Sequence, residues 1–383
     1  MRFLHTADWH VGKTLRGRSR LDEFAAALDE IAGIARDRRV DAVLIAGDVF
    51  DSPAPPAEAE KLVYDFLARL LPERIACVLI AGNHDHPRKL AALASLLEGL
   101  RIFVRADVRP PDQGGVVRVP SRDGSDEAQV AVLPFVPERR IVDACQLLGP
   151  EHEWYEEYAR RLEQVLARLT AGFTPKTVNL VVGHLLISGA RVGTGERPLH
   201  LGEVYGVNAQ QLPANAQYIA LGHLHRPQEL MAPSRTFYSG SILELDFGEV
   251  EQGKRVVVVD ALPGKAASVE SVPLTAGRRL RDVTGTLAEL AALAGTTGDD
   301  YLRVGVKVDG PVPGVAEQVR ELLPDALDVR LLYERSVPSP APVTQGLGPS
   351  QLFVEFYTRR NGTTPPPDME KLFHDTYDEA ARG

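Results

Sequence analysis

Aspartate, asparagine and histidine side chains recur along this chain in short motifs that could together bind metal ions. Five motifs follow one another: Asp8-Trp9-His10, Gly47-Asp48-Val49-Phe50-Asp51, Gly82-Asn83-His84-Asp85, Gly183-His184 and Gly222-His223-Leu224-His225. They offer carboxylate, carboxamide and imidazole donors and no thiolate, a mixture that suits manganese, iron or zinc. Two such ions about 3.5–4 Å apart can clamp the attacking and leaving oxygens of a phosphoryl displacement. The residue types therefore predict a two-metal site for phosphoester chemistry.

Asp48 is the best candidate for a bridging ligand, because one carboxylate can give an oxygen to each ion. Taken singly, each motif has a plainer interpretation, since Asp-x-His and Gly-Asn-His are common turns and His223 and His225 could be a surface pair. Asp85 has two interpretations as well, either orienting the His84 ring or capping the turn. The ordered set of five motifs favours the metal site over the separate turns.

Each motif follows a short apolar run that predicts a buried strand. These runs cover residues 1–7, 42–46, 76–81, 178–182 and 218–221. In open α/β sheets, ligands gather beyond the carboxyl ends of the strands, so the five motifs should meet at one rim. The intervening glycines permit sharp turns and a close approach of the backbone.

Apolar residues at helical spacing predict helices between these strands. The helical stretches are residues 21–35, 62–70 and 154–169, and further strands are expected at 116–119, 130–133, 236–239 and 255–260. The alternation indicates an α/β chain in which two sheets pack together with helices outside.

The pattern changes after Thr275, where no further metal-type motif occurs. Strand, helix, strand, helix and strand are predicted at residues 280–284, 287–293, 301–308, 315–322 and 327–332. We therefore divide the chain into a metal-bearing domain (1–275), a small α+β domain (276–335), a proline-rich linker (336–349) and a tail (350–383).

Two short helices are predicted in the tail, at residues 351–360 and 369–381, on either side of a triple proline. Their apolar stripes are Leu352, Phe353 and Phe356 in the first helix and Leu372, Phe373 and Tyr377 in the second. Because helices this short are marginal alone, the pair is predicted to dock onto a partner. Packing onto the chain's own main domain is the alternative.

The net charge of −9 argues against a general nucleic-acid binder. A basic run nevertheless follows the first motif directly, and we predict that it contacts a phosphate backbone. Its members are Lys13, Arg16, Arg18 and Arg20. A solvated loop is the alternative.

Cys77 and Cys145 are the two cysteines and make no disulfide framework. The first motif interrupts the N-terminus, so no leader peptide is predicted, and no apolar run reaches 18 residues. We therefore expect a cytoplasmic protein without a membrane span.

The order of the motifs resembles the calcineurin-like metallophosphoesterases, and the details resemble the SbcD family of bacterial nuclease subunits. Residues 1–13, 46–51, 80–85 and the loop 189–198 with the segment 199–202 carry the closer resemblance, which extends over essentially the whole chain. It implies an α/β fold, an α-β-β-α sandwich of two mixed sheets, with a small α+β cap domain and a C-terminal helical tail.

The resemblance also implies roles for individual residues. Asp8, His10, Asp48 and His225 would hold one metal ion, and Asp48, Asn83, His184 and His223 the other. His84 would contact the phosphate and assist the leaving oxygen. The implied activity is manganese-dependent cleavage of DNA, exonucleolytic from 3′ ends of duplexes and endonucleolytic on single strands and hairpins.

The implied assembly is a homodimer within a heterotetramer, near the nucleoid, in which the tail docks onto the coiled-coil base of an SbcC-type ATPase. The alternatives are a metallophosphoesterase acting on small phosphodiesters or phosphoproteins, and a scaffold without activity. Protein phosphatases of the superfamily carry Asp-Arg-Gly where this chain has Asp51-Ser52-Pro53, so the arginine that grips phosphate is missing. The complete ligand set argues against a scaffold. The roles of Asp51 and of the loop 189–198 are left open.

Overall fold

The computed structural model describes the chain except for residues 138–150, 194–205, 311, 334–348, 362 and 381–383. Cys145, nearly all of the predicted linker and the second half of the loop 189–198 therefore lie outside the described residues. Residues Met1–Leu332 form one compact unit, and Tyr333–Gly383 form a second. The boundary predicted at residue 275 remains a prediction.

The first sheet has six strands in the order β14-β13-β1-β2-β3-β4. Its strands are β1 (Arg2–Thr6), β2 (Ala42–Ile45), β3 (Ala76–Ile80), β4 (Ile102–Arg105), β13 (Arg255–Asp260) and β14 (Ser268–Pro273). The strands β1 to β4 are parallel, whereas β13 runs antiparallel to both β1 and β14. The carboxyl ends of β1, β2 and β3 consequently share one edge of the sheet.

The second sheet also has six strands, in the order β11-β12-β10-β7-β6-β5. Its strands are β5 (Val116–Pro120), β6 (Glu127–Leu133), β7 (Val178–His184), β10 (Tyr218–Gly222), β11 (Gln228–Leu230) and β12 (Arg235–Tyr238). The four central strands are parallel, and the edge strands β5 and β11 are antiparallel to their neighbours.

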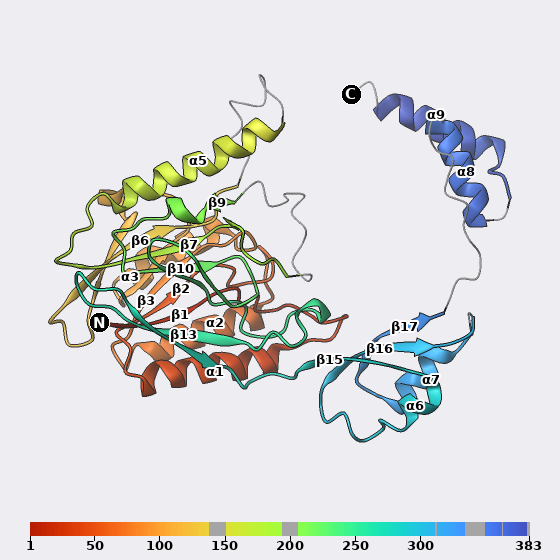
Figure 1. The fold of residues 1–383 in the computed structure, drawn as a ribbon, viewed down its shortest axis with the longest axis horizontal. Coiled ribbons are helices and arrows are strands. Elements are labelled where there is room, and N and C mark those ends of the chain that lie inside the picture. The colour runs from red at the N-terminus through yellow and green to blue at the C-terminus, as the bar shows by residue number, and fades with distance from the viewer. Residues whose placement is uncertain (138–150, 194–205, 311, 334–348, 362, 381–383) are drawn as a thin grey trace. The chain divides into compact units, whose positions relative to one another are not determined.

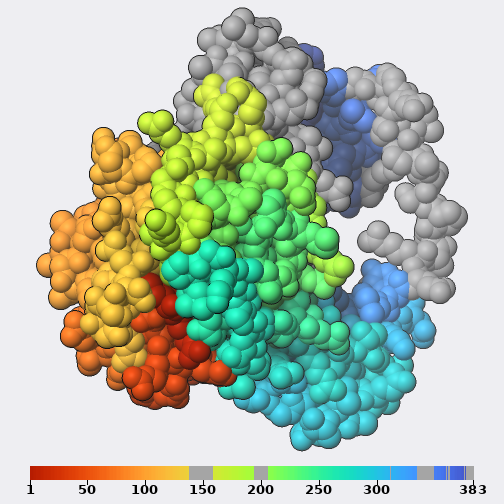
Figure 2. Space-filling model, turned by 60° about the vertical axis from the view of Figure 1, so that its left-hand side comes forward, coloured from red at the N-terminus to blue at the C-terminus, as the bar shows by residue number. Residues whose placement is uncertain are grey.

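Helices cover the outer face of each sheet, as Figure 1 shows. They are α1 (Leu21–Asp37), α2 (Ala57–Leu70) and α3 (Pro87–Glu98) on the first sheet and α5 (Glu151–Thr170) on the second. The prediction of an α-β-β-α sandwich of two mixed sheets is confirmed. Strand β9 (Val207–Asn208) lies beside α5. In Figure 2 the yellow-green surface of α5 accordingly adjoins the green surface that contains β9.

The pleat of the strands explains why both faces of each sheet are buried. In β1, Phe3 points into the core between the sheets, and its neighbour Leu4 points toward α1 and α2. All four residues of β2 are fully buried, which accounts for the continuous apolar run. Burying each of the three larger side chains, Val43, Leu44 and Ile45, contributes about 1.5–3 kcal/mol.

Helix α1 forms where the apolar spacing predicted it, with Phe24, Leu28 and Ile31 on its buried face. The sequence did not anticipate α3, β4 or β14. Helix α3 has Leu90, Ala94 and Leu97 at helical spacing, a signal that the prediction missed. The two strands lack a distinct pattern: β4 has only four residues, and β14 has polar side chains at three of its six positions. Tertiary pairing at the sheet edge supplies what the local pattern lacks.

The segment predicted as a small α+β domain contains three parallel strands in the order β15-β16-β17, and it lies within the first compact unit. Its elements are β15 (Leu280–Gly285), α6 (Leu287–Ala291), β16 (Tyr301–Lys307), α7 (Val315–Leu322) and β17 (Ala326–Leu332). The predicted succession of strands and helices is confirmed. Short pieces complete the first unit, namely β8 (Ile187–Ser188) and the 3-10 turns η1 (Pro111–Gln113), η2 (Ala209–Gln211) and η3 (Phe247–Glu249).

The second unit contains the two predicted helices, α8 (Pro349–Asn361) and α9 (Pro367–Ala380). Phe353 stacks on Phe373 with ring centroids 4.3 Å apart and an interplanar angle of 7°. Leu352, Phe356 and Leu372 are exposed. The side chain of Tyr377 lies outside the described residues. In the part of the chain that the structure describes, no helix is long and apolar enough to cross a membrane.

Candidate metal centre

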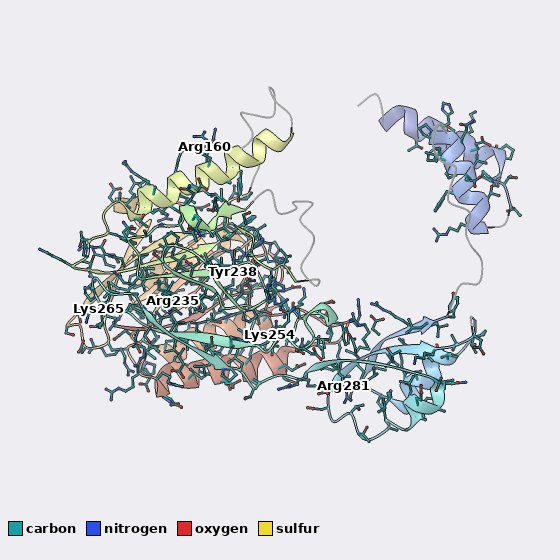
Figure 3. The ribbon with its side chains drawn as sticks, in the orientation of Figure 1. Arg160, Arg235, Tyr238, Lys254, Lys265 and Arg281 are labelled. Carbon is teal, nitrogen blue, oxygen red and sulfur yellow. The ribbon has the colours of Figure 1, made fainter. Side chains whose placement is uncertain are left out.

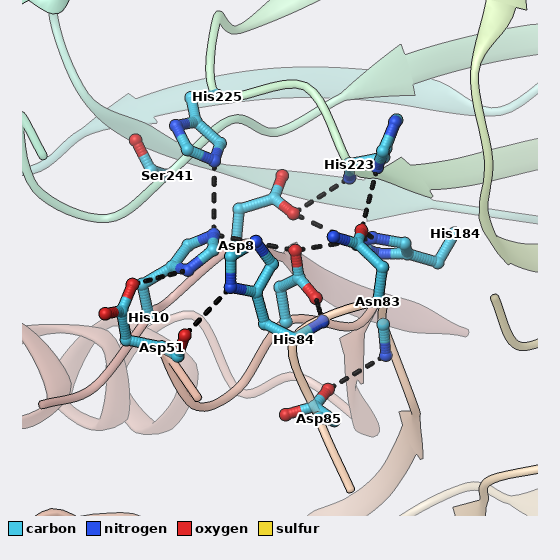
Figure 4. A network of polar contacts seen from close by, with 12 residues as sticks. Asp8, His10, Asp51, Asn83, His84, Asp85, His184, His223, His225 and Ser241 are labelled. Carbon is cyan, nitrogen blue, oxygen red and sulfur yellow. Dashed lines mark hydrogen bonds and ion pairs between the residues drawn. The ribbon is translucent and has the colours of Figure 1, made fainter. Parts of the chain in front are cut away.

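The five motifs meet at one rim of the sandwich, beyond the carboxyl ends of β1, β2, β3, β7 and β10. The first three strands belong to one sheet and the last two to the other. Figure 4 shows the predicted side chains converging, with His10 and His225 on one side of Asp8 and Asn83, His184 and His223 on the other. The structure thus brings together all seven predicted ligands and His84.

Two groups of donors share the carboxylate of Asp48. One group consists of His10, Asp48 and His84, and the other consists of Asp8, Asp48 and His184. Within each group the donor atoms lie within 4.8 Å of one another. A single carboxylate common to both groups is the arrangement that a bridging ligand requires.

His10 and His225 present the same ring atom to the centre. Their Nε2 atoms are 3.1 Å apart, and the Nε2 of His10 lies 3.5 Å from Asp48 Oδ2. Two nitrogens bound to one ion at about 2.1 Å would be roughly 3.0–3.4 Å apart for angles between square and tetrahedral. The pair therefore fits neighbouring ligands of one ion.

On the other side, Asn83 Oδ1 lies 3.0 Å from both His184 Nε2 and His223 Nδ1. His184 donates from Nδ1 to the Ala46 carbonyl over 2.8 Å, so its Nε2 carries the lone pair when the ring is neutral. That lone pair faces Asn83 Oδ1 and, at 3.5 Å, Asp48 Oδ2. Converging lone pairs of this kind need a cation or a proton among them.

The charges of the buried groups agree with this conclusion. Burial opposes protonation of His184, but the Asp48 carboxylate outweighs it and raises the pKa of His184 to about 9. Burial raises the pKa of Asp8 to about 7. Asp8 Oδ2 is buried and accepts no hydrogen bond from any residue that the structure describes, whereas Asp8 Oδ1 accepts one from the His223 amide over 2.8 Å. These donors fit divalent ions, which would supply the positive charge that the site lacks.

The backbone of the site is held in an unusual conformation. Asp8, His10, Asp48 and His223 have φ angles of 50°, 49°, 52° and 103°. Non-glycine residues in this region cost about 1–3 kcal/mol each and persist only where the surroundings hold them. This backbone conformation directs the four side chains toward the centre of the site.

Gly82 and Gly222 are required for close packing at the rim. A Cβ on Gly82 would overlap the Asp48 carboxylate, and one on Gly222 would overlap the Ala46 carbonyl. The second overlap lies between the two sheets. Glycine at these positions therefore lets the sheets approach closely enough for one site to draw ligands from both.

His84 is half-buried beside His10, with ring centroids 4.6 Å apart. Its Nδ1 donates to the Asp51 carbonyl over 2.8 Å, which leaves Nε2 as the atom available to a substrate. Its amide donates to Asp48 Oδ1 over 2.8 Å. Asp85 accepts hydrogen bonds from the amides of Val49, Phe50 and Gly82, so the turn-capping interpretation describes it.

Sequence reasoning missed two carboxylates behind the histidines. Glu249 accepts a hydrogen bond from His225 Nδ1 over 2.7 Å and pairs with Lys254. Asp51 Oδ1 lies 3.3 Å from His10 Nδ1 and pairs with Lys13. Glu249 lies in none of the five motifs. Asp51 lies in the second motif, but the sequence analysis left its role open.

The basic run is held by ion pairs. Lys13 donates to Asp51 over 2.9 Å, Arg16 to Asp328 over 3.1 Å and Arg18 to Asp325 over 2.9 Å. Both of the latter aspartates belong to the small α+β domain.

Arg20 differs from the rest of the run because its side chain is buried. It pairs with Glu23 at 2.7 Å and donates to the Glu244 carbonyl. Arg16 and Arg18 remain 43% and 45% exposed and could exchange their partners for phosphate. The buried position of Arg20 favours a structural role instead.

Two family models match the chain. The model of the calcineurin-like phosphoesterases matches residues 1–227. The model described as the type 5 capsule protein repressor C-terminal domain, SbcD_C, matches residues 276–361. The chain is therefore a calcineurin-like phosphoesterase, a hydrolase of phosphoester bonds.

Curated relatives narrow this class. The chain is 33% identical over 384 residues to the SbcD subunit of the nuclease SbcCD from Bacillus subtilis (strain 168), covering 97% of each chain. It is 35% identical to the protein of the same name from Rhodobacter capsulatus, covering 86% of each, and 32% identical to that of Escherichia coli (strain K12), covering 76% of this chain and 73% of the relative. The chain belongs to the SbcD family.

Among solved structures, a dimetal phosphatase from Danio rerio aligns with a TM-score of 0.41 and 12% identity, covering 71% of this chain and 99% of that chain. A likeness at this level carries no argument about the site.

Proposed function

We propose that this chain is the DNA nuclease subunit of an SbcCD-type complex and cleaves phosphodiester bonds with two divalent ions, manganese foremost. The observation that carries the proposal is the pair of donor groups that share Asp48. We assign Asp8, His10, Asp48 and His225 to one ion and Asp48, Asn83, His184 and His223 to the other. The oxygen and nitrogen donors suit manganese.

Hydrolysis of a phosphodiester demands that the site lower the barrier by on the order of 20 kcal/mol. Bound ions supply most of this, by neutralising phosphate charge and lowering the pKa of water. The Asp51 carbonyl fixes the ring of His84 through Nδ1–H, so the acid form is the imidazolium; it gives its Nε2 proton to the leaving oxygen and is left as the neutral Nδ1–H ring. A general acid of this kind contributes about 10²–10⁴-fold.

DNA is the proposed substrate, with exonucleolytic cleavage from 3′ ends of duplexes and endonucleolytic cleavage of single strands and hairpins. Arg16 and Arg18 support it, because both are partly exposed and follow the ligand His10 closely in sequence. A phosphate backbone would compete with Asp325 and Asp328 for them. Lys13 lies nearer the metal centre, because its partner Asp51 lies beside His10.

The partner we propose for the tail is an SbcC-type ATPase, within a heterotetramer that contains a homodimer of this chain. Leu352, Phe356 and Leu372 support the proposal, since these apolar side chains are 37%, 59% and 65% exposed. The stack of Phe353 on Phe373 holds α8 and α9 together, so the helix pair offers one surface. We place the complex in the cytoplasm, at the nucleoid.

The test is cleavage by the purified chain with manganese on three substrates: an end-labelled duplex, a hairpin and a small chromogenic phosphodiester. We expect cleavage of both DNA substrates, and none by Asp48→Asn. Turnover of the small phosphodiester alone would instead support the alternative, a phosphoesterase for small substrates. Metal analysis of the loaded protein should give two ions per chain, and one ion would overturn the bridging role of Asp48.

A further inference from the structure

His225 lies against a buried carboxylate on the side of its ring that faces away from the other donors. Its Nδ1 and Glu249 Oε1 are 2.7 Å apart, while its Nε2 faces His10. Glu249 is 1% exposed and His225 is 8% exposed. Bulk water therefore does not compete for this hydrogen bond.

Glu249 is itself held by donors at its second oxygen. Oε2 accepts from Lys254 Nζ over 2.6 Å, from Ser241 Oγ over 3.1 Å and from the Leu245 amide over 3.2 Å. Lys254 is 7% exposed and lies just before β13; it is labelled in Figure 3. Ser241 appears beside His225 in Figure 4.

The buried ion pair of Glu249 with Lys254 is expected to add little to the stability of the fold, because the cost of desolvating two charges offsets their attraction. Its effect on His225 is more specific. A carboxylate only accepts hydrogen bonds, so His225 must carry its proton on Nδ1, and the lone pair is left on Nε2. Nε2 is the atom that faces His10 and the centre.

We propose that Glu249 is a positioning residue that fixes the tautomer and ring orientation of His225, and that Lys254 holds Glu249 in place. The inference rests on the proposed role of His225 as a metal ligand. Carboxylates placed behind metal-bound histidines act in this way, and their loss costs about 10–100-fold in metal affinity.

A similar arrangement lies behind His10, where Asp51 Oδ1 is 3.3 Å from Nδ1 and Lys13 pairs with Asp51. That pair is more exposed, with 30% of each side chain accessible. The two histidines that share one ion in the proposed assignment thus each have a carboxylate and a lysine behind them. The buried pair at Glu249 constrains its histidine more tightly.

The decisive substitution is Glu249→Gln. Lys254 and the Leu245 amide can only donate, so the amide oxygen must stay on their side, and the amide NH2 must face His225 Nδ1. His225 then has to accept at Nδ1 and carry its proton on Nε2, the wrong tautomer for binding. We expect manganese affinity to fall about 10–100-fold at one of two sites.

Two readouts separate this effect from a loss of packing. In the metal-free protein, the ¹⁵N shifts of His225 should change from an Nδ1–H to an Nε2–H pattern. The double variant Glu249→Gln with Lys254→Met removes the charged donor at 2.6 Å and leaves only the longer contact from the Leu245 amide at 3.2 Å. The amide of Gln can then turn, so that its oxygen accepts from His225 again and its NH2 donates to Ser241 Oγ, whose own proton goes to the Leu243 carbonyl. We expect this variant to regain about tenfold in affinity over the single variant, within the loss expected at this site.

Glu251→Gln is the matched control, because Glu251 lies on the same segment and is exposed. It should bind manganese as the wild type does. His225→Ala tests the ligand role on which the inference depends, and unchanged binding there would overturn the proposed site itself.

If His225→Ala weakens binding but Glu249→Gln binds manganese normally and keeps the Nδ1–H tautomer, the positioning role is wrong. A double variant that binds no better than a folded single variant would also overturn it. Circular dichroism shows whether the single variant folds. If it does not, the double variant tests the positioning role by itself: His225 must then show the Nδ1–H tautomer, and the Nε2–H tautomer would overturn the role.

Discussion

The Nε2 atoms of His10 and His225 lie 3.1 Å apart, although the residues are 215 positions apart in the sequence. Because Nδ1–H of His225 donates a hydrogen bond to Glu249, the Nε2 of that ring carries the lone pair and points at His10. Two imidazoles are held in this way only where a proton or a cation lies between them. The pair belongs to one half of the proposed two-metal centre, and the carboxylate of Asp48, common to both donor groups, would join it to the other half.

Asp48→Asn should affect both ions at once, since the amide keeps the shape of the side chain but removes the charge shared by the two groups. We expect DNA cleavage to fall by at least about 10³-fold, which corresponds to about 4 kcal/mol of barrier. Calorimetric titration with manganese should show weaker binding at both sites. Weakening at one site only would contradict the bridging role.

His84→Gln should lower kcat by about 10²–10⁴-fold and leave metal binding intact, because we place His84 at the leaving oxygen. Single-turnover cleavage and manganese titration on the same preparation measure the two effects. A variant that cleaves DNA at the wild-type rate would remove His84 from the mechanism. A variant that loses an ion would make it a ligand.

Arg20→Gln should destabilise the first unit, whereas Arg18→Gln should hardly do so. Arg20 and Glu23 are 2% and 12% exposed, and breaking a buried pair costs roughly 3–5 kcal/mol. Arg18 and Asp325 are 45% and 28% exposed, and such pairs are worth about 1 kcal/mol or less. Thermal unfolding measures both.

The DNA-binding prediction is tested on the same basic run. Arg18→Gln combined with Arg16→Gln should reduce the dependence of DNA affinity on salt, by a slope of about 0.9 for each phosphate that is no longer neutralised by an arginine. An unchanged slope would mean that the run serves only the ion pairs with the small α+β domain.

His5 should make stability depend on pH. Complete burial lowers the pKa of His5 to about 3 from the ordinary 6.5, and the hydrogen bond from the ring to the Leu221 carbonyl opposes this shift only in part. Below pH 6.5 the unfolded chain binds a proton there that the folded chain does not, so stability falls toward pH 3 by up to about 1.4 kcal/mol per pH unit. His5→Gln removes this term, and its stability difference from the wild type should shrink between pH 7 and pH 4. Denaturation of metal-free protein measures it, and a constant difference would refute it.

Phe356→Ser with Leu372→Ser should abolish binding of the ATPase partner, because it removes exposed apolar area without touching the Phe353–Phe373 stack. Cleavage of a small phosphodiester should be unchanged. Lys371→Ala, at an exposed position on α9, is the control. Wild-type binding by the double variant, or by a chain lacking residues 346–383, would refute the docking role.

Local patterns in the sequence determined the donor types and their positions at strand ends. Short apolar runs ending in Gly47, Gly82 or Gly222 indicated buried strands, and parallel strands share a carboxyl edge, so the ligands could be expected at one rim. The helices α1, α8 and α9 followed from apolar spacing or from their flanking prolines. The five motifs required no more than this, whereas the choice of the seven ligands among their side chains came from the resemblance to the SbcD family.

Only the tertiary structure decided which residues form hydrogen bonds to those ligands and which charged side chains are buried near them. Arg20 is buried because Glu23 and the Glu244 carbonyl, 224 positions away, enclose it, and no local pattern separates it from Arg18. Glu249 and Lys254 lie in no motif, and their hydrogen bonds to His225 link η3 and the residue before β13 to the loop that follows β10. The sequence by itself determined which atoms could bind metal, whereas the packing of two sheets determined their tautomers and strained backbone, because those depend on contacts between residues far apart in the chain.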